Sequence, residues 1–275
     1  GIPADAWLRY EAAYRADLSR ITEEESLAQH VDAIDANAAT FLRSLGATTA
    51  TRANPGRLVS DFLAFHRCGT WEVYEHLHET ASQGDYALAA LKESGADVAP
   101  TALTTWLRAA EFAEPFERGR KYEYDEAQLR SALPELRARA ALPDKTMLRD
   151  IAGQLAEIGV VFMVVDPPKR FPLLGMTRWI DKRVPVIQQT GRWGKDGFVI
   201  WALFHELGHV LNDPRGEMHL EFKTEKKRTS VAEKGANQFA FETLFGAGGI
   251  EPFQGLTRDG DIVRVCAQTG ELVAL

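Results

Sequence analysis

The fold of the C-terminal half is decided by residues 196–211, which read DGFVIWALFHELGHVL. Apolar residues recur in this stretch at helical spacing and can bury one face of a helix: Ile200, Leu203, Leu207, Val210 and Leu211. A different face carries Trp201, His205, Gly208 and His209. Because Asp196 is a residue type that caps helices, we expect a helix from about Gly197 to Leu211.

The second face of this helix carries the residues with chemistry. His205 and His209 are four residues apart, so in a helix both imidazoles can bind one metal ion. Glu206 lies beside them, where it can accept a proton from an attacking water instead of binding the metal. This H-E-x-x-H spacing is typical of zinc peptidases. The alternative interpretation is two hydrogen-bonded histidines on a surface helix.

A catalytic zinc ion needs three protein ligands and one open position. The metzincin arrangement is excluded, because Asn212 and Arg215 stand where that pattern has glycine and histidine. A carboxylate on the following helix is another common solution, and Glu233 is the best candidate. Asn237, one turn later, could hydrogen-bond a ligand histidine and fix its ring orientation.

Other interpretations of the third ligand stay open. Ser230 and Glu233 form a capping-box pattern, so Glu233 could simply close the start of a helix. Glu242 is a rival on the same helix. Three further carboxylates lie nearer to the histidines in a charged connection: Asp213, Glu217 and Glu221.

Residues 1–142 form a helical region. They are rich in Ala, Leu, Glu and Arg, and apolar residues recur in them at helical spacing. The clearest helical segments are residues 7–18, 58–66 and 103–110. We therefore expect an N-terminal all-helical domain over residues 1–142.

The pattern changes in residues 143–275. We expect a helix over residues 147–158, strands over 160–165, 176–180 and 184–188, a helix over 230–245 and a strand-like tail over 262–265. Helices beside a small sheet predict an α+β fold for this zincin-like second domain. The strand over 184–188 is a possible edge along which a substrate could lie.

Composition sets the broad class. A hydrophobic content of 45% with 26% charged residues describes a soluble globular protein, and the net charge of −7 argues against a nucleic-acid-binding surface. The longest apolar run, Val160–Val165, is too short to cross a bilayer. Cys68 and Cys266 make no disulfide framework, and no secretion signal opens the chain, so we expect a cytoplasmic protein. A chain that opens with Gly1 suggests a piece of a longer protein.

Two stretches resemble the ImmA/IrrE family of metallopeptidases. Residues 205–211 read HELGHVL, and residues 233–240 read EKGANQFA, which is similar to the family's E-x-x-A-[ND]-x-F-A. Residues 175–179, GMTRW, also look like the family. The resemblance implies that His205, His209 and Glu233 bind Zn²⁺ and that Glu206 is the catalytic base. One departure is residues 244–247, LFGA, where the family usually has Leu-x-Pro.

The resemblance also implies a function. Many relatives carry an N-terminal helix-turn-helix of the Xre/HigA type, and residues 1–9 look like the tail of one. We expect a zinc-dependent endopeptidase that cleaves a regulatory protein such as a transcriptional repressor, with DNA bound only through the missing N-terminal domain and no membrane partner. The alternative is a transcriptional regulator in which the zinc domain is a sensor or interaction module without proteolysis.

The residue that stabilises the oxyanion is left open. Arg178, Arg192 and His219 are candidates, each also explained as structural or solvent-exposed. The other histidines form no convincing ligand set: His30, His66, His76 and His78.

Overall fold

The structure, a computed structural model, describes residues 3–79, 98–142, 144–169, 171–191, 196–222 and 230–246. Its elements confirm the predicted α+β class. The chain divides into two compact units. The first comprises Gly1–Thr80 and Ala99–Arg108, and the second comprises Ala81–Val98 and Ala109–Leu275.

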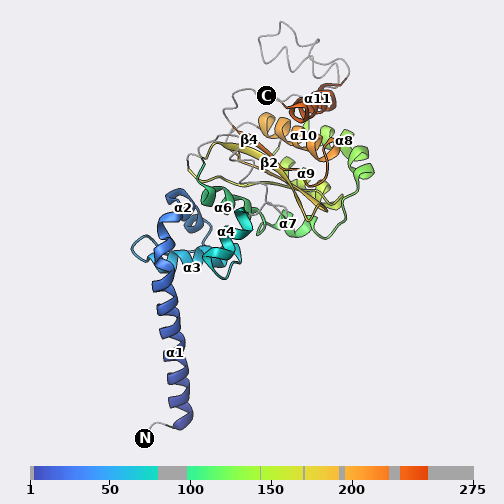
Figure 1. The fold of residues 1–275 in the computed structure, drawn as a ribbon. Helices are drawn as coiled ribbons and strands as arrows, with labels where there is room; N and C mark the ends of the chain where they lie inside the picture. Colours follow the sequence, from blue (N-terminus) through green and yellow to red (C-terminus); the bar gives the residue numbers. More distant parts are fainter. Residues whose placement is uncertain are drawn as a thin grey trace. The chain divides into compact units, whose positions relative to one another are not determined.

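The first unit is helical, as the sequence predicts (Figure 1). Its elements are α1 (Ala4–Leu27), η1 (Ala28–Ala33), α2 (Ala36–Ser44), α3 (Pro55–His66), α4 (Trp71–Glu79) and α6 (Pro100–Ala110), the last as far as Arg108. The largest fully buried side chains of this unit are Ile34, Leu42, Leu58, Phe62, Leu103 and Trp106. Four of these residues come from the periodic segments 58–66 and 103–110, which therefore indicated both their helices and the buried faces.

Helix α1 differs from the other α-helices of this unit. It is 24 residues long and has no buried residue. Its aromatic side chains Trp7, Tyr10 and Tyr14 are 61–67% exposed. Ion pairs one turn apart support it instead: Arg9–Asp5, Arg15–Glu11 and Arg20–Glu24. Among the described helices, α1 included, none combines the length and the apolarity that crossing a bilayer requires.

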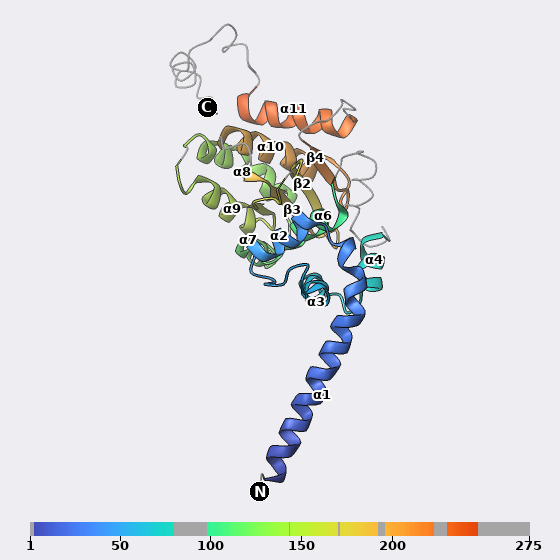
Figure 2. The same cartoon turned by 90° about the vertical axis from the view of Figure 1, so that its left-hand side faces the viewer.

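The second unit combines helices with a small sheet (Figure 2). Its helices are α7 (Glu114–Gly119), α8 (Glu126–Ala140), α9 (Met147–Glu157), α10 (Asp196–Asn212) and α11 (Val231–Phe245). Its strands are β1 (Val161–Val164), β2 (Leu173–Ile180), β3 (Val184–Gln189) and β4 (His219–Phe222), in the order β1-β3-β2-β4. β1 and β3 are parallel, whereas β2 runs antiparallel to β3 and β4. The predicted tail strand over 262–265 lies outside the described residues.

Alternate residues of the strands bury opposite faces of the sheet. Phe162 and Ile187 join a core with apolar residues of α8, α9, α10 and α11. Val161 and Val186 point into a smaller cluster with Phe116 of α7. The sheet is thus covered on both faces, which explains why β1 reads as a continuous apolar run and not as an alternating one.

The division between the two units differs from the boundary expected at residue 142. Helices α7 and α8 precede that boundary but belong to the second unit. Leu129, Leu136 and Ala140 of α8 are buried in the same core as α9 and α10. Helical spacing shows which face of α8 is buried but not which neighbour buries it.

The strand expected to lie at an edge does not. β3 pairs with β1 on one side and with β2 on the other, so the interpretation of residues 184–188 as a substrate-binding edge is wrong. Its side chains from Pro185 to Gln189 are all buried, as expected of a strand covered on both faces. β4 stands at the end of the strand order instead.

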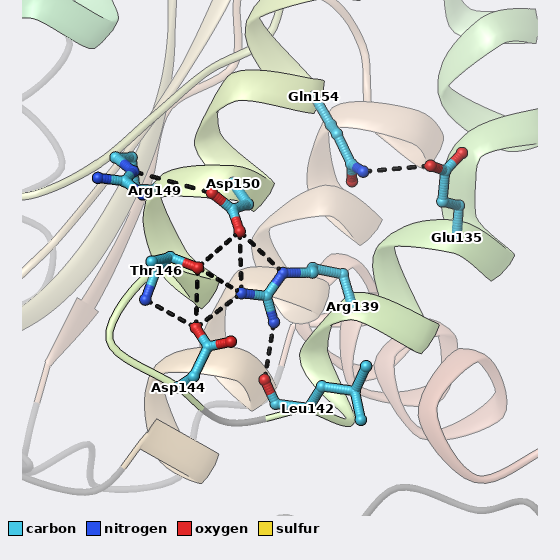
Figure 3. A network of polar contacts seen from close by, with 8 residues as sticks. All are labelled: Glu135, Arg139, Leu142, Asp144, Thr146, Arg149, Asp150 and Gln154. Atoms are coloured by element: carbon cyan, nitrogen blue, oxygen red, sulfur yellow. Dashed lines mark hydrogen bonds and ion pairs between the residues drawn. The ribbon is translucent and has the colours of Figure 1, made fainter.

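A polar network ties the end of α8 to the start of α9 (Figure 3). The Arg139 guanidinium donates to Asp150 at 2.9 and 3.1 Å, to Asp144 at 2.8 Å and to the carbonyl of Leu142 at 2.7 Å. Thr146 adds hydrogen bonds to both carboxylates. The hydrogen bond from Arg139 is the main reason that the pKa of Asp144 is lowered to about 2. Arg139 therefore joins the two helices through ionised carboxylates.

Arg139→Met is expected to destabilise the protein in a pH-dependent way. A carboxyl whose pKa is lowered on folding adds stability above its ordinary pKa, and this stability is lost as the pH falls toward the folded value. The difference in unfolding free energy between the native and variant proteins should be full above about pH 4 and shrink toward pH 2, which denaturant titrations at several pH values measure. Arg149→Met is the control, because Arg149 is exposed and its ion pair with Asp150 is long, at 3.8 Å. A loss of unfolding free energy that is equal at every pH would contradict the role of the ionised carboxylates.

Candidate metal centre

The site begins with the close packing of α10 and α11. Leu203, Phe204 and Leu207 bury one face of α10 in the core. On the side toward α11, a Cβ atom at Gly208 would lie only 3.0 Å from the Ala236 Cα atom and 3.3 Å from its carbonyl oxygen. Glycine at this position therefore lets the two helices approach closely.

This packing brings three ligand-type side chains together. His205 Nε2 lies 3.1 Å from His209 Nε2 and 3.3 Å from Glu233 Oε2. His209 Nε2 lies 3.5 Å from Glu233 Oε1. Both histidines are buried, at 4% and 2% exposure, and Glu233 is partly buried. Glu233 is more than twenty positions from the two histidines in sequence, yet the donor atoms of all three residues converge.

The partners of the outer ring nitrogens favour one tautomer of each histidine. His205 Nδ1 lies 3.2 Å from Asn237 Oδ1, and His209 Nδ1 lies 2.6 Å from Asp213 Oδ2. An amide oxygen and an ionised carboxylate only accept, so both Nδ1 atoms carry the proton and donate it. Where both rings are neutral, the two Nε2 lone pairs face each other and Glu233. Such an arrangement is repulsive unless a positive charge lies between the lone pairs, and a proton or a metal ion can supply the missing positive charge.

The donor set fits zinc. Tetrahedral coordination with bonds of about 2.0–2.2 Å places two ligand atoms about 3.3–3.6 Å apart. The three separations here are 3.1, 3.3 and 3.5 Å. Two imidazoles and one carboxylate are also a ligand set of catalytic zinc sites. The residues that could hold the ion are therefore His205, His209 and Glu233.

The electrostatics of the cluster also favour a cation. Burial alone would lower the pKa of His209, but hydrogen bonding to Glu233 and the charge of Glu206 outweigh it and raise that pKa to about 9. Burial would raise the pKa of Glu233, yet its hydrogen bonds with both histidines hold that pKa well below the usual range. These side chains stabilise positive charge at the point where their donor atoms meet.

Glu206 is placed differently from the three donors. Its side chain is only 1% exposed, and Oε2 accepts a hydrogen bond of 2.6 Å from Thr177 Oγ1 on β2. Burial is the main cause that raises the pKa of this carboxyl. Opposite Oε1, a Cβ atom at Gly175 would lie 3.5 Å away, so β2 passes close to the carboxylate. The Glu206 carboxylate is therefore held against the sheet.

Only one of the two hydrogen bonds of a capping box is found at Glu233. Ser230 Oγ accepts a hydrogen bond of 3.1 Å from the backbone nitrogen of Glu233 and caps α11. The carboxylate of Glu233 contacts the two histidines instead. The rival Glu242 accepts a hydrogen bond from Gln238. Capping and contact with the histidines are therefore compatible in Glu233.

The structure describes two of the three candidates for stabilising the oxyanion, and their surroundings differ. Arg178 is buried and pairs with Glu111 at 3.1 Å. Arg192 lies outside the described residues. His219 stacks on His209 with ring centroids 3.7 Å apart, and burial together with the charge of His209 lowers its pKa to about 4. His219 is therefore a neutral imidazole beside the cluster.

The sequence did not predict the contacts that two residues make at the site. Thr177 binds Glu206 across the sheet, and no spacing rule connects residues 29 positions apart. Asp213 was considered only as a rival ligand, although it follows His209 by four residues and could have been recognised as its helical neighbour. Among the described residues, the two groups close enough to share a metal ion both contain His209.

Comparison of the chain with protein-family models, with curated proteins and with solved structures found no match. The resemblance to the ImmA/IrrE family therefore stays a prediction that rests on the motif residues.

Proposed function

We propose that this chain is a zinc-dependent endopeptidase of the ImmA/IrrE type, which cleaves a regulatory protein such as a transcriptional repressor. The observation that carries the proposal is the convergence of His205, His209 and Glu233 beside the buried carboxylate of Glu206. Three ligands and a neighbouring carboxylate that is not a ligand are the parts that zinc-assisted peptide hydrolysis needs.

When bound, zinc would supply Lewis acidity that polarises the substrate carbonyl and makes water a better nucleophile. The chain itself supplies the proton transfers. The hydrogen bond from Thr177 occupies Oε2 of Glu206, so Oε1 is the oxygen that can accept the proton of the attacking water. The same carboxyl can then deliver this proton to the leaving amine.

The substrate would be an extended peptide segment. β4 lies at the end of the strand order and carries His219, whose ring stacks on His209. Among the described residues, β4 pairs only with β2, so a peptide can add as a further strand along its other edge. Such a strand would lie beside β4, whose His219 ring stacks on His209.

Zinc removal tests this proposal. The purified chain is incubated with purified transcriptional repressors, beginning with any that is encoded beside its gene, and cleavage is followed by intact-protein mass spectrometry. Cleavage should disappear after chelation and return when stoichiometric zinc is added, because the histidine and glutamate side chains alone cannot polarise the carbonyl. Cleavage that persists in the chelated protein would contradict the proposal. If no cleavage occurs under any condition while regulation in cells is intact, a sensor or interaction role becomes the better account.

A further inference from the structure

His209 differs from His205 in the group that holds its outer nitrogen. His205 faces a neutral amide, whereas His209 Nδ1 lies 2.6 Å from the Asp213 carboxylate. Asp213 is itself fixed by the backbone, since its nitrogen donates to the His209 carbonyl at 3.1 Å. Asp213 therefore binds His209 through both its backbone and its side chain, just after the last residue of α10.

His219 supports the same pair from the sheet. Its ring lies nearly parallel to that of His209, at 11° and 3.7 Å between centroids. Its Nε2 atom is 3.1 Å from Asp213 Oδ2, the oxygen that also contacts His209. The His209 ring is thus confined on one face by His219 and at its outer edge by Asp213.

One pair of neighbouring residues in the sheet contacts both Glu206 and His209. Thr177 of β2 and His219 of β4 are directly opposite each other in the antiparallel register. Thr177 donates to Glu206, and His219 stacks on His209. The pairing of β2 with β4 therefore fixes the supports of the base and of one histidine together.

A second metal position is the competing interpretation, because His209, Asp213 and His219 also present their ligand atoms within 4.8 Å of one another. Two observations argue against it. His209 would have to lose the Nδ1 proton that it donates to Asp213. The in-plane lone pairs of two nearly parallel stacked rings also do not converge on one point. The geometry suits a hydrogen bond from His209 to Asp213 and stacking of His219 on His209.

From these contacts we infer that Asp213, supported by His219, is a positioning residue for His209. It holds the Nδ1–H tautomer and the ring orientation that direct Nε2 toward His205 and Glu233. The inference rests on the proposed zinc site, because it assigns to Asp213 a share of the zinc affinity. Carboxylates that accept from a ligand histidine typically contribute about 10–100-fold to metal affinity.

Zinc affinity of the full chain tests the inference without any substrate. Competition with a chromophoric chelator should show roughly 10–100-fold weaker zinc binding for Asp213→Ala than for the native protein. Asp213→Asn keeps an oxygen acceptor but loses the charge, so its loss should be smaller. Glu217→Ala is the matched control, because Glu217 is a half-exposed carboxylate 3.9 Å from His219 in the same connection. Its affinity should match that of the native protein.

A second measurement does not depend on the variants folding. Nitrogen-15 NMR of the histidine rings in the native zinc-loaded chain should report a protonated Nδ1 and a metal-bound Nε2 for His209. An unprotonated Nδ1 in His209, or a folded Asp213→Ala protein that binds zinc as tightly as the native one, would overturn the inference and leave the zinc site standing. A native chain that binds no zinc would overturn both.

Discussion

Glu206→Gln is expected to lower the turnover number for peptide cleavage by roughly 10²–10⁴-fold, the usual contribution of a positioned general acid–base group. Glutamine keeps the size of the side chain and can still accept from Thr177, but it cannot take a proton from water. Glu206 is not one of the three converging ligand residues, so zinc content should be unchanged.

The measurement is single-turnover cleavage of the partner protein by zinc-loaded enzyme, with zinc quantified in the same samples. Glu217→Gln serves as a control, because it removes a carboxylate that lies near the site, 3.9 Å from His219, and is not one of the converging ligand residues. A Glu206→Gln variant that retains full activity with its zinc would show that another group accepts the proton.

Glu233→Gln is expected to have the largest effect on metal binding. It removes the negative charge that contacts both histidines, at 3.3 and 3.5 Å, while keeping the size of the side chain. The loss of zinc affinity should exceed the roughly 10–100-fold typical of removing a group that only supports a ligand. Chelator competition measures this loss directly.

Ser230→Ala separates ligation from capping. Ser230 accepts from the Glu233 backbone nitrogen, so this variant removes the helix cap and leaves the carboxylate in place. It should cost about 1 kcal/mol of unfolding free energy and leave zinc affinity unchanged. If Ser230→Ala and Glu233→Gln instead lower stability alike and leave zinc affinity alone, Glu233 is a capping residue and not a ligand.

The sequence was most informative where one element carries its own signal. The spacing of His205 and His209 and the apolar stripe of α10 are local features, and α10 forms with both on the predicted faces. The short apolar run at β1 likewise indicated a buried strand. In each case a pattern within fewer than about twenty residues specifies the element and its buried side.

Features that depend on tertiary packing could not be predicted in this way. The partner of α8 and the place of β3 within the sheet both depend on neighbours distant in sequence. The same holds for Thr177 and His219, which reach the site through the register of β2 and β4. Which residues face each other across two strands depends on the patterns of both strands and on the segment that joins them, so the pattern of one strand alone does not specify the register.

The most direct test of the central claim is a crystal structure of the zinc-loaded chain with diffraction recorded on both sides of the zinc absorption edge. We expect one anomalous peak, bonded at about 2.0–2.2 Å to His205 Nε2, His209 Nε2 and a Glu233 carboxylate oxygen, with Glu206 outside bonding distance. A zinc-loaded crystal with no anomalous peak at this cluster, or with the zinc bound elsewhere, would contradict the account.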